Sequence, residues 1–116
     1  MKQINLKQVQ QLLNSFLNKT VYIHLETTNG AYASHLNKAA NVGAFIRNAK
    51  VNLSHCTIVQ DKDTYRVGLK MDNGWIYAEG ITHWELYEET KLLMAGHDPD
   101  GRLMVALQLS ETPFEN

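Results

Sequence analysis

The chain has 116 residues, of which 44% are hydrophobic and 20% are charged, and its formal net charge is −1. This composition is typical of a globular domain with a packed core and excludes an intrinsically disordered chain. The Lys and Arg residues are scattered along the sequence, which argues against nucleic acid or an anionic membrane as the main partner. We therefore expect one domain over residues 1–116.

Cysteine usage and the N-terminal residues indicate the compartment. Cys56 has no second cysteine with which to form an internal disulfide. The first residues carry no continuous apolar run of the kind found in a signal peptide, and no apolar run is long enough to span a bilayer. We therefore expect a protein of the reducing cytoplasm.

The N-terminal segment has the pattern of an amphipathic helix. Apolar residues recur at helical spacing over residues 5–18, and Lys, Gln, Asn and Ser occupy the other face. Asn5 can cap this helix, and Gln8, three residues later, can complete a capping box. The pattern predicts one helix that covers a core with its apolar stripe.

After this helix the apolar residues recur with a period of two, which is typical of strands. Turn signals separate the strands, the clearest being Asn29-Gly30, Asn73-Gly74 and the run from Asp98 to Gly101. Strands are expected at residues 21–27, 31–36, 43–48, 51–60, 64–71, 75–81, 92–96 and 103–109. The sequence therefore predicts a mainly β protein with one N-terminal helix, α+β at the margin. Its sheet is expected to be an antiparallel, partly open barrel or sandwich of about seven or eight short strands.

Several segments resemble the YojF family of small proteins from Bacillus and its relatives. They are residues 21–26 (VYIHLE), 46–51 (IRNAKV), 65–70 (YRVGLK), 75–80 (WIYAEG) and 92–96 (LLMAG). The resemblance covers nearly the whole chain. It supplies no catalytic motif, because the family has no established activity. Its genes tend to lie beside that of a zinc-dependent sugar deacetylase of bacillithiol synthesis, so the resemblance implies such an enzyme as a partner.

The first predicted hairpin brings together residues that can bind a metal. If Asn29-Gly30 is a two-residue loop, His24 lies directly opposite His35. Two opposed His side chains are close enough to share one ion such as zinc, and Glu26, on the diagonal, is the candidate third ligand. Tyr22 lies on the same face. The alternative, which we favour, is a partly buried aromatic patch that holds no metal.

A second hairpin and the aromatic residues suggest a different kind of site. With Asn73-Gly74 as the loop, Glu79 lies opposite Gly68 with Arg66 and Lys70 on its diagonals, and we interpret this group as a surface charge ladder.

Trp75, Tyr77 and Trp84 are candidates to line the mouth of a barrel that carries a small molecule, with Tyr22 as a further ligand contact. The alternative is that these aromatic residues form edges of the core.

His55 and Cys56 do not form a pair for nucleophilic catalysis. Neighbours in a strand point to opposite faces, so the imidazole cannot act as the base for the thiol. We expect Cys56 to be a small core residue.

The sequence carries none of the common motifs of hydrolases, nucleotide-binding enzymes or metalloproteases. Our leading hypothesis is a non-catalytic binding or accessory protein that forms homo-oligomers and works beside the sugar deacetylase. The first alternative is a metal-binding protein or small metal-dependent enzyme that uses His24 and His35, with Glu26 or Tyr22 in support. The second alternative is a small-molecule carrier.

Overall fold

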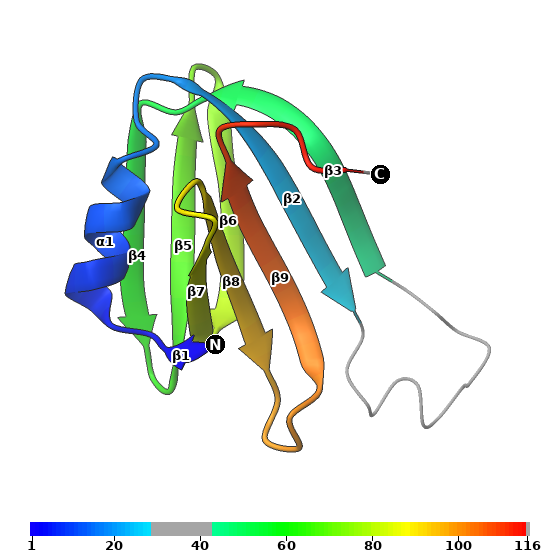
Figure 1. Cartoon of the computed structure of the whole chain (residues 1–116). Helices are drawn as coiled ribbons and strands as arrows, with labels where there is room; N and C mark the ends of the chain where they lie inside the picture. The colour runs from blue at the N-terminus through cyan, green and yellow to red at the C-terminus, as the bar shows by residue number, and fades with distance from the viewer. Residues whose placement is uncertain (29–42, 116) are drawn as a thin grey trace.

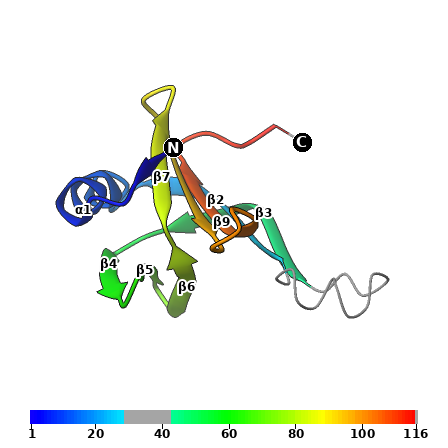
Figure 2. The same cartoon turned by 90° about the horizontal axis from the view of Figure 1, so that it is seen from below.

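The computed structural model describes residues 1–28 and 43–115, which form one helix and two antiparallel sheets (Figure 1). In spatial order, the larger sheet contains β1 (Lys2–Gln3), β7 (His83–Tyr87), β8 (Lys91–His97), β9 (Leu103–Ser110), β2 (Thr20–Thr28) and β3 (Gly43–Asn52). The smaller sheet contains β4 (His55–Asp61), β5 (Thr64–Met71) and β6 (Gly74–Ile81). Figure 2 shows the two sheets at an angle to each other, with α1 (Leu6–Asn14) at one side.

The core lies between the two sheets and under the helix. Alternate residues of each strand point inward, as the period of two requires. The largest fully buried side chains come from the helix, from both sheets and from the link between β3 and β4: Val9, Leu13, Val21, Ile23, Leu53, Val67, Leu69, Ile81, Leu92, Met94, Leu107 and Leu109. No helix in the described part of the chain is long and apolar enough to cross a membrane.

The predicted fold class is confirmed: the chain is mainly β with one N-terminal helix. The sequence predicts a partly open barrel or a sandwich. Over its described residues, the structure has two open sheets, of six and three strands, and does not form a closed barrel. The strand predicted at residues 64–71 has the bounds of β5. The predicted strand at 31–36 and the Asn29-Gly30 turn lie outside the described residues.

The helix begins where the sequence predicts and ends earlier. The side chain of Asn5 accepts a hydrogen bond from the Gln8 backbone N–H at 3.0 Å, which caps the first turn. The α-helical hydrogen bonds stop at Asn14, because the next residues make tighter i→i−3 bonds. Asn18 then adopts a positive φ of 59° and turns the chain into β2.

The second predicted hairpin is present with a register that differs by two residues. Met71 pairs with Gly74, so the two-residue loop is Asp72-Asn73 rather than Asn73-Gly74. Gly68 consequently lies opposite Tyr77, not opposite Glu79. A shift of two residues keeps every side chain on its face, so the apolar pattern alone cannot distinguish the two registers.

Two strands were not predicted. β1 has only two residues, too few to show a period, and it pairs with β7 through Lys2 and Trp84. In β7, only Trp84 is buried, and Leu86 is exposed. β1 is too short to show a period, and β7 alternates over only five residues, with Trp84 and Leu86 two positions apart, which is a weak signal.

The two sheets are in backbone contact at two glycines. Gly80, near the end of β6 and just before the chain continues into β7 of the larger sheet, has a positive φ of 82°, and Gly96 of β8 packs against its carbonyl. A Cβ at Gly96 would overlap the carbonyl oxygen of Gly80 and the side chain of Val105. The absence of a side chain at Gly96 therefore allows this contact between the two sheets.

We expect Gly96→Ala to lower the free energy of unfolding by about 3 kcal/mol, because backbone has to move to admit the methyl group. Gly74→Ala is the matched control. A Cβ there meets no atom within 4 Å, so the change should stay within about 0.5 kcal/mol of wild type. Urea unfolding followed by circular dichroism measures both values, and equal stabilities of the two variants would contradict the close contact.

Candidate functional site

The outer face of the larger sheet carries a bulge between β2 and β3. Ile23 pairs with Ala49, and Leu25 pairs with Ile46, so β3 has one residue more than β2 in this interval. Arg47 and Asn48 both lie opposite His24. Asn48 has a φ of 57°, a conformation that Asn tolerates better than most residues.

The side chain of His24 is buried at this bulge, with 6% of the residue exposed. Its Nδ1 lies 3.2 Å from Nη1 of Arg47, and its Nε2 lies 3.5 Å from a carboxylate oxygen of Glu26. The rings of Phe45 and Phe114 meet the imidazole edge-on, with centroids at 5.2 and 6.2 Å. A guanidinium can only donate, so Nδ1 accepts and the ring proton lies on Nε2, toward Glu26.

The bulge also holds the C-terminal tail, residues 111–115, across the outer face (Figure 1). The Asn48 side chain donates to the Phe114 carbonyl at 2.8 Å and accepts from the Phe114 N–H at 2.7 Å. We call these two hydrogen bonds the tail clamp. Arg47 donates to the carbonyl of Glu115, and its guanidinium lies 5.0 Å from the centroid of the Phe114 ring.

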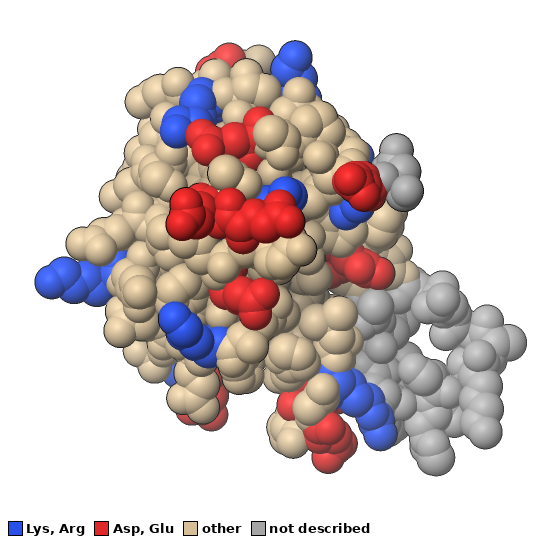
Figure 3. All heavy atoms as spheres, in the orientation of Figure 1, with Lys and Arg blue, Asp and Glu red and all other residues tan. Residues whose placement is uncertain are grey.

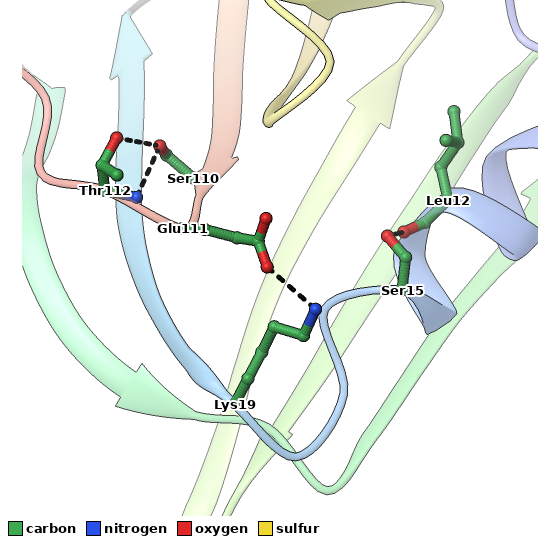
Figure 4. Close-up of polar contacts among 6 residues, drawn as sticks. All are labelled: Leu12, Ser15, Lys19, Ser110, Glu111 and Thr112. Atoms are coloured by element: carbon green, nitrogen blue, oxygen red, sulfur yellow. Dashed lines mark hydrogen bonds and ion pairs between the residues drawn. The ribbon is translucent and has the colours of Figure 1, made fainter.

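The tail is held at its start as well (Figure 4). Glu111 forms an ion pair with Lys19 at 2.8 Å, and the Thr112 N–H donates to the hydroxyl of Ser110 at 3.1 Å. The ion pair connects the tail to the segment between α1 and β2. The tail is therefore fixed at both ends, by Lys19 and by the tail clamp.

A pocket of about 470 Å³ opens between the tail, the sheet and the β7–β8 turn. It is lined by Arg47, Tyr87, Glu88, Lys91, Leu93, Gln108, Thr112, Pro113, Phe114 and Glu115. Its size is ordinary for a small-molecule site. Figure 3 shows acidic side chains gathered in the middle of this face, over the β7–β8 turn that carries Glu88 and Glu89.

Both signs of charge line the pocket. Lys91 donates to Glu88 at 3.1 Å, and this hydrogen bond lowers the pKa of Glu88, so the carboxylate is ionised at neutral pH. The ammonium of Lys91 has two further N–H groups. With Arg47 and the amide of Gln108, it offers donors to a polar ligand that carries an anionic group.

The four predicted ligand-binding residues do not share one site. Tyr22 is on the outer face of the larger sheet, between Lys50 and Ser110. Trp75 and Tyr77 are on the outer face of the smaller sheet. Trp84 is in the core with 3% exposed, and its Nε1 has no hydrogen-bond partner among the described residues.

A larger hollow of about 610 Å³ lies between α1 and β7. Trp84 lines it together with Leu12 and Leu86, and the Lys2 ammonium lies 5.1 Å from the centroid of the Trp84 ring. This lining has more apolar than polar surface. We place the candidate site at the smaller pocket instead, since there two cations, Arg47 and Lys91, converge with the amide of Gln108 and the tail.

The structure brings two of the three predicted metal ligands together. His24 and Glu26 are neighbours, and His35 lies outside the described residues. Within residues 1–28 and 43–115, no three His, Cys, Asp or Glu side chains are grouped so as to hold a metal ion. Along β2, His24 pairs with Gln108 of β9 on one side and faces the bulge on the other. Metal binding therefore stays a prediction, and an ion on Nδ1 would have to displace Arg47.

Sequence reasoning missed the residues that build the pocket. Arg47 and Asn48 fall within the segment 46–51 that carries the family resemblance, but no local pattern marks a bulge there. Lys91 and Gln108 look like ordinary surface residues of strands. Phe114 lies beyond the last strand and reaches His24 only through the tail.

Cys56 is a core residue, as predicted. Its neighbour His55 is exposed on the other face of β4, so no base faces the thiol from the adjacent position. Burial raises the pKa of the Cys56 thiol to about 11. At neutral pH the thiolate fraction is then about one in ten thousand, too low for a nucleophile.

We expect Cys56 to react with Ellman's reagent at pH 8 roughly a hundredfold more slowly in the native protein than in the urea-unfolded chain, because burial removes both thiolate and access. Absorbance of the released thiolate measures both rates. A native rate equal to the unfolded rate would show an accessible, ionised thiol.

A substitution at Asn48 can remove the tail clamp and still permit the positive φ that the bulge requires at this position. Asn48→Gly permits the positive φ and deletes both hydrogen bonds to Phe114, so we expect a loss of about 1 to 2 kcal/mol in the free energy of unfolding. Asn48→Ala should lose about 1 kcal/mol more, from the strained φ. Hydrogen exchange at the Phe114 amide should become faster in both variants. Unchanged exchange in Asn48→Gly would contradict the clamp.

Comparison with known proteins places the chain among related sequences. Residues 3–114 match the family model described as "Protein of unknown function (DUF1806)". The chain is 52% identical over 115 residues to "Uncharacterized protein YojF" of Bacillus subtilis strain 168, with 98% of each sequence covered. It is also similar to the crystal structure of the Bacillus subtilis YojF protein, with a TM-score of 0.81 and 46% identity. That match covers 99% of this chain and 97% of the other.

Proposed function

The chain belongs to the DUF1806 family, and from this premise we propose that it is a non-catalytic binding protein of the cytoplasm. Its binding site is the pocket between the C-terminal tail and the outer face of the larger sheet. The ligand is a small polar molecule with an anionic group. The observation that carries the proposal is the convergence of Arg47, Lys91 and Gln108 on one pocket that the tail borders.

The interactions of the pocket favour binding over catalysis. Both nitrogens of His24 face partners, Arg47 and Glu26, so the imidazole holds the guanidinium in place. The Arg47 guanidinium is fixed from a second side by the tail. A side chain held in this way loses little conformational entropy when a ligand binds, which raises affinity. Cys56, the one thiol of the chain, is buried in the core.

An accessory role extends the proposal. In the described part of the chain, β3 ends the larger sheet and pairs only with β2. Its Phe45 is among the most exposed large apolar side chains. An edge strand with exposed apolar residues can pair with another chain, so β3 supports assembly either as a homo-oligomer or with the sugar deacetylase expected from the family resemblance.

A thermal-shift screen tests the ligand site. The probes are inorganic phosphate and a panel of small phosphorylated and carboxylated molecules. A ligand at about ten times its Kd should raise Tm by about 5 °C, because it binds the folded state alone. Lys91→Ala should abolish most of the shift. Arg66→Ala, which removes a cation from the opposite sheet, is the matched control and should keep it.

The screen and one purification separate the competing functions. A shift that survives Lys91→Ala would place the ligand elsewhere. Metal retained by purified protein and lost in the His24→Ala, His35→Ala double variant would favour the metal-binding alternative. Stoichiometric recovery of a sugar deacetylase with the tagged protein supports the accessory role, and recovery of the protein alone would count against it.

A further inference from the structure

The outer face of the smaller sheet presents two aromatic rings to solvent. Trp75 is 40% exposed and Tyr77 is 54% exposed. The two rings are nearly parallel, with an interplanar angle of 11° and centroids 5.5 Å apart. Large aromatic surfaces are usually buried, so an ordered, stacked and exposed pair indicates a contact surface.

A glycine between the strands allows this arrangement. Gly68 of β5 lies directly opposite Tyr77, and the ring edge of Tyr77 rests against it. A Cβ at Gly68 would lie 3.0 Å from Cε1 of Tyr77, which is tighter than most real contacts, so the ring would have to move by a few tenths of an ångström. The ring therefore lies low over β5 rather than standing away from the sheet. We call Trp75, Tyr77 and Gly68 the aromatic platform.

Polar groups border the platform at both ends. One row across the three strands contains His55, Lys70 and Trp75. The imidazole of His55 meets the Trp75 ring edge-on, and the Lys70 ammonium lies 5.9 Å from the centroid of the same ring. At the other end, Arg66 donates to Glu79 at 2.6 Å. These groups can exchange hydrogen bonds with hydroxyl groups of a ligand.

The charge of this face decides between ligands that stack on aromatic rings. A single-stranded nucleic acid needs several cations along its backbone, because phosphate neutralisation dominates its affinity. Of the two cations in the rows of this face, Arg66 is already paired with Glu79, which leaves Lys70. A neutral ligand with apolar faces and a polar rim fits this balance better than a polyanion.

We propose that the aromatic platform binds a saccharide. The apolar C–H face of a pyranose ring lies against Trp75 and Tyr77, where hydrogens that carry partial positive charge meet the negative faces of the rings. The hydroxyl groups at the rim of the sugar reach His55 and Lys70. A β-linked chain of pyranoses, which is flat, matches the platform better than a curved α-linked chain. This site is on the opposite sheet from the anion pocket and does not depend on it.

Nuclear magnetic resonance of the 15N-labelled full chain tests the proposal with three probes. Cellotetraose is the flat, β-linked saccharide, maltotetraose is the curved, α-linked saccharide, and an oligothymidylate is the polyanion. The chain has two tryptophans, and Trp84 is buried, so the two indole signals separate the platform from the core. Cellotetraose should shift the Trp75 indole signal and leave Trp84 unchanged. Maltotetraose should bind more weakly.

Three variants keep the result interpretable. Trp75→Ala should weaken cellotetraose binding by about tenfold or more, as judged from the amides of β5 and β6. Gly68→Ala keeps both rings and moves that of Tyr77 by a few tenths of an ångström, so it should weaken binding by less than Trp75→Ala does while the fold is retained. Phe45→Ala removes an exposed aromatic ring from the other sheet and should leave binding unchanged.

Other outcomes would overturn the proposal. No shift with either sugar, or shifts that persist in Trp75→Ala, would show that the platform is not a saccharide site. Stronger binding of the oligothymidylate would identify a nucleic-acid surface. Trp75 shifts that follow protein concentration without any ligand would identify a contact between two copies of the chain.

Discussion

The outer face of the larger sheet depends on one extra residue in β3. Without the bulge, a strand opposite β2 would present a single side chain to His24, and alternation would place the next one in the core. With the bulge, Arg47 and Asn48 both reach the outer face. Arg47 fixes the imidazole, and Asn48 holds the backbone of Phe114. The pocket therefore exists because a local irregularity of the sheet positions a distant segment of the chain.

A second constraint relates the two sheets. Gly96 and Gly80 touch where the chain passes from β6 of the smaller sheet to β7 of the larger sheet, so the two layers are held closely on that side. On the other side, α1 packs near β4, and the side chain of Gln10 bonds to the backbone of Cys56 and Ile58. Each sheet thereby keeps its inner face in the core and its outer face open. The two outer faces carry different chemistry: charged groups and the tail on one, and exposed aromatic rings on the other.

Much of the fold could be predicted because its signals are local. The cap at Asn5, the alternation in β5 and the Asp98 turn each involve residues a few positions apart, and all three are as expected. The site could not be predicted in the same way. The bulge at Asn48 is defined only by its pairing with β2, and Phe114 contacts His24 across about ninety intervening residues. The register of the β5–β6 hairpin was missed for a related reason, since a shift of two residues leaves the apolar pattern unchanged.

The most direct test of the account is amide chemical-shift mapping of the 15N-labelled chain during a titration with inorganic phosphate, the simplest anion that the pocket can take. The account predicts that the largest shifts occur at Arg47, Gln108 and Phe114, which come from β3, β9 and the tail and meet only at the pocket. Shifts confined to α1 or to β4–β6, or no shifts at concentrations of tens of millimolar, would contradict the claim that the bulge and tail form an anion-binding site.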